Sequence, residues 1–199
     1  MNFFNKVKWI LGILIVFVLI ITTNLIDRNN FVRVRDSVVT IYEDRLIVKG
    51  IIYDISKTIQ EKELAVAKSD TSFFDAENPK INKELEVLIS NYEKTKLTDE
   101  ENKNFNDLKA HLKDLKASEQ QFIDSELSDK SAINNDINAI KANLDDLSRI
   151  QLDEGNKQMA ISKRAIDTVE LFTQMEIYFL IFLALLIQII IIYQPKDKS

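Results

Sequence analysis

Two long apolar segments, one near each end of the chain, constrain its fold more than any other feature. Trp9 to Ile26 is a run of 18 residues without a charged side chain, and Ile177 to Tyr193 is a run of 17. As a helix the first run is about 27 Å long, close to the roughly 30 Å core of a bilayer. A helix in a soluble core normally keeps a polar face, which neither run provides. We therefore predict two transmembrane helices, at 9–26 and 177–193.

The first run has an alternative interpretation as a cleaved signal peptide, because Lys6 and Lys8 precede it. Residues 21–24 (Ile-Thr-Thr-Asn) offer no small-residue cleavage site, and the helical pattern continues past them. We therefore favour a retained membrane anchor.

The charges around the two runs predict their orientation. Residues 1–8 carry a net charge of +2 and residues 194–199 carry +1. Because the whole chain carries −5, residues 27–176 carry −8. Short basic tails stay in the cytoplasm. We predict a two-pass protein of the cell (inner) membrane, with cytoplasmic tails at 1–8 and 194–199 and an extracytoplasmic or periplasmic domain at 27–176.

Composition narrows the fold class and the chemistry. With 3 Gly, 2 Pro and no Cys, the chain has few of the residues that turns require and no disulfide or thiolate metal site. We find no nucleophile motif, no phosphate-binding loop and no basic stripe. We therefore predict an all-α protein that is not an enzyme, needs no cofactor or metal, and binds no nucleic acid.

Apolar residues recur every 3.5 positions on average through most of residues 27–176, as in coiled-coil helices that pack side by side. The repeat falls into four stretches, which predicts four helices. The first stretch is continuous with the run 9–26, and the fourth leads into the run 177–193. The repeating positions are Phe31, Val34, Val38, Ile41, Arg45, Val48, Ile52, Ile55, Ile59, Lys62 and Val66; Ile81, Leu85, Leu88 and Tyr92; Phe105, Leu108, Leu112, Leu115 and Phe122; and Ile133, Ile137, Ile140, Leu144, Leu147, Met159, Ile166 and Val169.

Two short motifs predict where the middle helices begin. Asn78 followed by Pro79 is typical of an N-cap with proline at the first helical position. Thr98 and Glu101 have the spacing of a capping box, in which each side chain bonds the other residue's backbone N–H.

These features predict a membrane-anchored antiparallel four-helix bundle, whose first and last helices continue into the two transmembrane helices. In such a pair, facing residues have numbers with a constant sum, and the ends of the two apolar runs give 203. The middle helices are shorter and cover only part of the long pair. We expect a second copy of the chain to cover the rest, in a homodimer.

Two charged residues, Arg45 and Lys62, interrupt the apolar repeat. Arg45 stands where an aliphatic residue is expected, and the constant sum places Gln158 opposite it and Glu154 one turn away. A guanidinium there could bind an anionic ligand through its two-pronged fork. Alternatively, Arg45, Glu154 and Gln158 form a polar layer that fixes helix register. Gly50 and Gly155 fall near the same level, where they would allow a close approach of the two helices or leave a small cavity.

Three stretches of this sequence resemble one known family. They are residues 23–26 (TNLI), 35–46 (RDSVVTIYEDRL) and 147–155 (LSRIQLDEG). They are similar to patterns around the first span and the last sensor helix in the HlyB-like four-helix-bundle sensor modules of methyl-accepting chemotaxis receptors. The order of basic tail, span, long helix, helical hairpin, long helix and span resembles that family over nearly the whole chain.

The resemblance implies signal reception outside the cell by a dimer of bundles. Members of the family usually continue after the second span into a HAMP linker and a long signalling hairpin, whereas six residues follow Tyr193 here. We therefore expect the output to pass through an unidentified membrane or cytoplasmic signalling partner. A structural role, as a stalk or scaffold subunit of a membrane or envelope complex, is the alternative.

Overall fold

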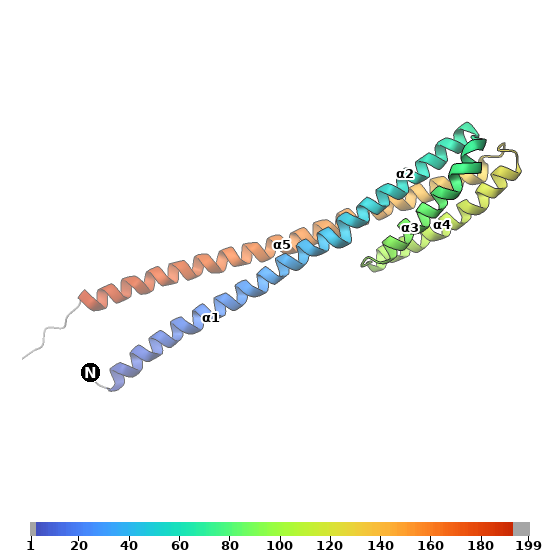
Figure 1. Ribbon diagram of the computed structural model, residues 1–199. Coiled ribbons are helices and arrows are strands. Elements are labelled where there is room, and N and C mark those ends of the chain that lie inside the picture. The colour runs from blue at the N-terminus through green and yellow to red at the C-terminus, as the bar shows by residue number, and fades with distance from the viewer. Residues whose placement is uncertain (1–2, 193–199) are drawn as a thin grey trace, which may run out of the picture. The chain divides into compact units, whose positions relative to one another are not determined.

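The computed structural model describes residues 3–192, and every regular element in this range is a helix (Figure 1). The predicted all-α class is therefore confirmed. Residues 1 and 2 of the predicted N-terminal tail, and the whole predicted C-terminal tail at 194–199, lie outside the described residues. The elements are α1 (Phe3–Thr40), the π-helical turn η1 (Ile41–Leu46), α2 (Ile47–Lys68), the π-helical turn η2 (Phe73–Glu77), α3 (Asn78–Glu93), α4 (Asp99–Asp124) and α5 (Ser131–Ile192).

The chain forms two compact units, of which the one at residues 39–158 is the bundle. Its core lies between η1 with α2, α3, α4 and the first part of α5, and neighbouring helices run in opposite directions (Figure 1). The sequence repeat predicted this core correctly within the unit. Its buried apolar residues are Val48, Ile52, Ile55, Ile59, Ala65, Val66, Phe74, Ile81, Leu85, Tyr92, Phe105, Leu108, Leu115, Phe122, Ile133, Ile137, Ile140, Leu144 and Leu147.

Local backbone chemistry explains two helix ends in the bundle. Ser69 adopts the left-handed conformation (φ 51°) after α2, and its N–H and that of Asp70 donate to the last free carbonyls of the helix. At the start of α4, the Thr98 hydroxyl accepts from the Glu101 N–H, and the Glu101 carboxylate accepts from the Thr98 N–H. The predicted capping box is therefore confirmed.

The predicted N-cap at Asn78 is wrong. The turn η2 leads directly into α3, so Asn78 already has helical backbone angles, and no side chain caps the helix there. Pro79 lies in the first turn, as predicted. The Asn78 side chain is instead buried and bonds to core polar groups. The preceding helical turn supplies backbone carbonyls that accept from N–H groups at the start of α3, as Phe73 accepts from the Asn78 N–H. No N-cap side chain is therefore needed at this helix start.

The other unit contains residues 1–38 and 159–199, which are most of α1 and the second half of α5. The buried positions among its described residues are small or polar: Thr23, Asn30, Ser37, Ser162 and Ala165. Large apolar members of the repeat face outward in this unit, where the sequence predicts cover by a second copy of the chain rather than by the middle helices. A repeat identifies a stripe along a helix but does not say what covers it. The outward residues of the repeat, with their exposed fractions, are Phe31 (71%), Val38 (55%), Met159 (60%) and Ile166 (52%).

Two helical stretches of the described chain are long and apolar enough to cross a membrane, judged by length and composition. They are Ile10–Lys68 and Ser131–Ile189. Only 6% of the most apolar window in the first stretch is buried, and 0% in the second. The core helix of a soluble protein would instead be mostly buried, so these windows need another covering.

Gly50 and Gly155, which were predicted to allow a close approach of two helices, have no close neighbour on the side where a Cβ would stand. A Cβ built on Gly50 or Gly155 would meet no heavy atom within 4 Å beyond its own helix. The predicted close approach of two helices at this level is therefore wrong. Both glycines lie inside helices, where they carry the entropic cost of glycine without a packing role.

Gly155→Ala should therefore stabilise the protein by about 0.5–1 kcal/mol, because alanine is the better helix former and has free space. The reverse change at an exposed position of the same helix, Ala142→Gly, should destabilise it by a similar amount. Urea unfolding of the full chain in detergent, followed by circular dichroism, measures both. Destabilisation by Gly155→Ala would mean that another backbone approaches this position after all.

Candidate functional site

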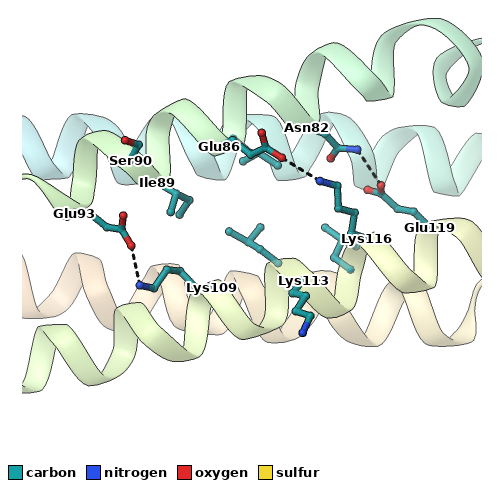
Figure 2. A pocket seen from close by; sticks show the side chains of 12 residues that line it. Asn82, Glu86, Ile89, Ser90, Glu93, Lys109, Lys113, Lys116 and Glu119 are labelled. Atoms are coloured by element: carbon teal, nitrogen blue, oxygen red, sulfur yellow. Dashed lines mark hydrogen bonds and ion pairs between the residues drawn. The ribbon is translucent and has the colours of Figure 1, made fainter.

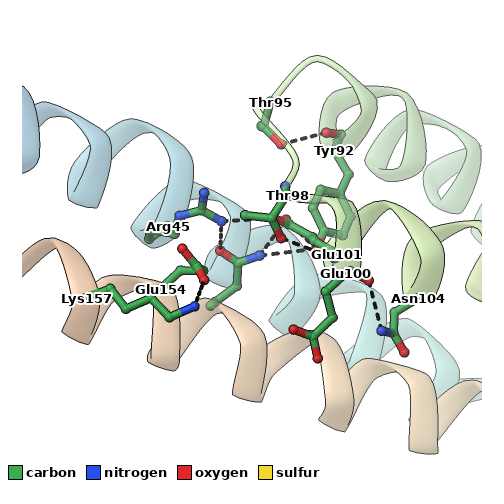
Figure 3. Close-up of polar contacts among 10 residues, drawn as sticks. Arg45, Tyr92, Thr95, Thr98, Glu100, Glu101, Asn104, Glu154 and Lys157 are labelled. Carbon is green, nitrogen blue, oxygen red and sulfur yellow. Dashed lines mark hydrogen bonds and ion pairs between the residues drawn. The ribbon is translucent and has the colours of Figure 1, made fainter.

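Four buried polar side chains, one from each helix of the bundle, meet at one level and form what we call the arginine layer. It consists of Arg45 on η1, Tyr92 at the end of α3, Glu101 in the first turn of α4 and Gln151 on α5. Glu101 is fully buried, and the Arg45 side chain is only 8% exposed. Arg45 is the buried residue of the π-helical turn, and Figure 3 shows its side chain close to the residues of the α3–α4 loop and the start of α4.

Glu101 is the hub of the arginine layer. One carboxylate oxygen accepts from Arg45 Nη1 at 2.9 Å and from the Thr98 backbone, and the other accepts from the Tyr92 hydroxyl at 3.0 Å and from the Gln151 amide. Gln151 Oε1 in turn accepts from Arg45 Nη1 at 3.1 Å. The buried charge therefore has both a counter-ion and neutral partners, which a buried ion pair requires to be tolerated.

Burial is also the main cause of a raised pKa at Tyr92, and the neighbouring Glu101 carboxylate raises it further. The Tyr92 hydroxyl therefore stays protonated and serves as a hydrogen-bond donor. Its ring lies against Phe105 with centroids 4.4 Å apart, which ties the layer to the apolar core. One donor in the layer remains free: Arg45 Nε is buried and has no partner among the described residues.

The sequence predicted Arg45 correctly as a polar member of the buried seam but predicted the wrong neighbours. Glu154 pairs with Lys157 one turn along α5, and Gln158 makes no hydrogen bond with the described residues. The true partner on α5, Gln151, lies two turns from the predicted one. The predicted register used the ends of the apolar runs, which define facing residues only loosely. In the structure, the packing of the bundle core determines which residue of α5 faces Arg45.

Glu154 also lines a surface hollow of about 320 Å³ between the start of α4 and α5. Glu100, Arg149 and Asp153 line it as well. Figure 3 shows Glu154 and Lys157 beside Arg45, but no polar contact joins Arg45 to either residue. Ligand binding by Arg45, Glu154 and Gln158 together stays a prediction.

A second buried polar group, the lysine cluster, lies nearer the tip of the bundle. Lys62 on α2 is fully buried, and its ammonium donates to Asn78 and Asn82 on α3 and to Glu119 on α4. Asn78 also donates to Glu119, at 3.0 Å. Burial lowers the pKa of Lys62, and the Glu119 carboxylate opposes that shift. The cluster joins α2 to the α3–α4 hairpin.

Sequence reasoning missed most members of both groups. Lys62 was visible as a charge in the apolar repeat, like Arg45. Glu101 already had a role as a helix cap, so its second role as a buried counter-ion gave no separate signal. Gln151 and Glu119 lie among many polar residues on their helices, and only the three-dimensional register shows which of them face inward.

Comparison with known proteins decides the family. The model of the family described as "four helix bundle sensory module for signal transduction" matches residues 5–166. The chain belongs to this family. The resemblance to the sensor modules of chemotaxis receptors is therefore confirmed. Comparison of this chain with curated proteins and with solved structures found no match.

The lysine cluster gives a direct test of the core of this sensory module. Glu119→Leu should destabilise it by about 3–5 kcal/mol, because the change leaves the buried Lys62 ammonium without its counter-ion. The double variant Lys62→Met with Glu119→Leu should recover most of that loss. Urea unfolding of the full chain in detergent, monitored by circular dichroism, measures both changes.

The control for this experiment is an exposed ion pair of the same hairpin. Glu86 pairs with Lys116 at 3.0 Å on the surface, so Glu86→Gln should change stability by no more than about 1 kcal/mol. Equal effects of the two single variants would show that Lys62 and Glu119 are solvated rather than buried.

Proposed function

We propose that this sensory module crosses the cell membrane twice and receives its signal on the extracytoplasmic side. The observation that carries the proposal is the combination of a sensory four-helix-bundle family with two apolar helical windows that nothing buries. Burying such windows in lipid removes a large apolar surface from water. Both tails are then cytoplasmic, because they carry the net positive charge while residues 27–176 carry −8.

The polar residues of the first apolar run are compatible with a membrane. The Thr22 hydroxyl donates to the Val18 carbonyl at 2.8 Å, and the Asn24 amide donates to the Ile20 carbonyl at 2.8 Å. Each of these bonds satisfies one donor of the side chain within its own helix, which lowers the cost of placing the residue in lipid. The polar end of this run therefore does not prevent it from spanning the bilayer.

Single cysteines test the topology, since the chain has none of its own. In intact cells, a membrane-impermeant thiol reagent should label Lys96→Cys, which is exposed in the loop between α3 and α4. Asn2→Cys and Ser199→Cys should become labelled only after the membrane is permeabilised. Labelling of either terminal cysteine from outside would contradict the proposal.

We also propose that the module is a homodimer that pairs through the outer face formed by the end of α1, η1 and the start of α2. Large apolar side chains recur there with heptad spacing and lie on the surface: Val39, Leu46 and Tyr53 are seven residues apart, with Tyr42 between the first two. Charged neighbours such as Asp44 keep this stretch out of the bilayer. An exposed heptad seam of this kind is covered most simply by the same seam of a second copy.

Leu46→Cys should therefore form an intermolecular disulfide under mild oxidation in membranes. Lys103→Cys, on the exposed face of α4, serves as the control and should stay monomeric, because α4 lies outside the proposed interface. Denaturing gels without reductant measure the fraction of crosslinked dimer. Equal crosslinking at both positions, or none at position 46, would remove the support for this interface.

The signal then passes from the bundle along α5 to a membrane or cytoplasmic signalling partner. Support for this route is that α5 is one unbroken helix from Ser131 to Ile192, which includes both core positions of the bundle and the second apolar run. A ligand-induced change at the bundle end of α5 would therefore act on the same helix that contains the second apolar run.

A further inference from the structure

The outer side of the α3–α4 hairpin carries a groove that lies mostly outside the two buried polar groups. Its volume is about 340 Å³, within the range of pockets that hold small molecules. Leu85 and Ile89 of α3, and Leu112 and Leu115 of α4, form its apolar floor. Figure 2 shows Ile89 pointing into the gap between the two helices.

The two rims of the groove have opposite charges. Glu86 and Glu93 line the α3 side, and three lysines that share one face of α4 line the other. Two ion pairs bridge the rims, Glu93 to Lys109 at 2.8 Å and Glu86 to Lys116 at 3.0 Å. Both pairs are exposed, so an incoming charged group competes with them at little cost.

Lys113 lies between the two bridging pairs and is the one lysine of the lining without an acidic partner, because the third carboxylate of the lining, Glu119, pairs with the buried Lys62. The antiparallel register places it across from Ile89, so no acidic residue faces it. It makes no hydrogen bond or ion pair with the described residues, and its side chain extends away from α3 (Figure 2). Its long flexible side chain can turn over the groove toward an anion at modest entropic cost.

From this arrangement we propose that the groove binds a small amphipathic carboxylate, with its apolar body on the leucine floor and its carboxylate at Lys113. The apolar floor supplies the hydrophobic contact, and the lysine face of α4 supplies the charge complement. An uncharged molecule of the same shape gains only the first of these, and an ammonium compound finds each carboxylate of the lining already paired with a lysine.

One end of the groove reaches the lysine cluster. Asn82 and Glu119 line the groove and also bond to the buried Lys62 of α2. An occupant that shifts these two side chains therefore acts on a charge buried in the core. In this way a ligand on the surface of the hairpin changes how the hairpin is held to α2.

The proposal rests on the proposed sensory function, since it names the chemical class that the module would detect. Its test does not depend on membrane topology or on an output partner. If the groove binds no carboxylate while the predicted topology and dimer are observed, this inference is refuted and the proposed function is not.

The experiment measures protection of a cysteine in the groove by a probe carboxylate. The full chain with Ile89→Cys, in lipid nanodiscs, is alkylated by N-ethylmaleimide with and without phenylbutyrate, and with its uncharged amide, phenylbutyramide. Ser90→Cys at the rim is a second reporter in case position 89 does not tolerate the change. Asn91→Cys, on the adjacent exposed position outside the groove lining, is the control.

Phenylbutyrate at about twice its Kd should slow alkylation of the groove cysteine about threefold, as occupancy of a single site requires. It should leave the control cysteine unchanged, and the amide should protect much less. Adding Lys113→Gln should remove the preference for the carboxylate, whereas Lys103→Gln elsewhere on α4 should not. Equal alkylation of groove and control cysteines, equal protection by acid and amide, or protection that survives Lys113→Gln unchanged would each overturn the proposal.

Discussion

A guanidinium buried inside a bundle must have a counter-ion, and this requirement at Arg45 determines how the four helices meet. Its carboxylate partner, Glu101, can reach it only if the first turn of α4 lies at the level of η1. Glu101 also caps α4 through Thr98, so the position of the helix start and the position of the counter-ion are the same constraint. Gln151 then fixes the level of α5, and Tyr92 that of α3. One charged pair thus sets the register of every helix in the bundle.

The lysine cluster repeats this arrangement nearer the tip, with a buried ammonium in place of the guanidinium. Between the two polar levels the core is apolar and specifies distance more than register, because aliphatic side chains pack in many ways. Charges, in contrast, tolerate few arrangements in a low-dielectric interior. A bundle held at two polar levels has a well-defined resting state. It can also be shifted by anything that competes for the partners of Lys62 or Arg45, which is a useful property in a sensory module.

The sequence predicts the helices and the bundle core well, because apolar residues at a spacing of 3.5 need cover on one side. Outside the bundle the repeat does not show which side of the helix faces the other helix of the same chain. Phe31 and Met159 continue the repeat but face outward, while Asn30 and Ser162 are buried. The repeat shows Arg45 as an anomaly but cannot show its partners, since Glu101 is 56 residues away in sequence and already serves as a cap. Register between distant helices depends on side-chain fit, which a single sequence does not display.

The central claim is that Arg45 and Glu101 form a buried pair on which the bundle's register depends, and a double-mutant cycle tests it most directly. The variants Arg45→Met, Glu101→Gln and their combination are unfolded in urea as full chains, together with the same cycle for Arg45 and Glu154. The account predicts a coupling free energy of about 1–3 kcal/mol for Arg45 with Glu101, and a value within about 0.5 kcal/mol of zero for Arg45 with Glu154. Negligible coupling to Glu101, or equal coupling to both glutamates, would contradict it.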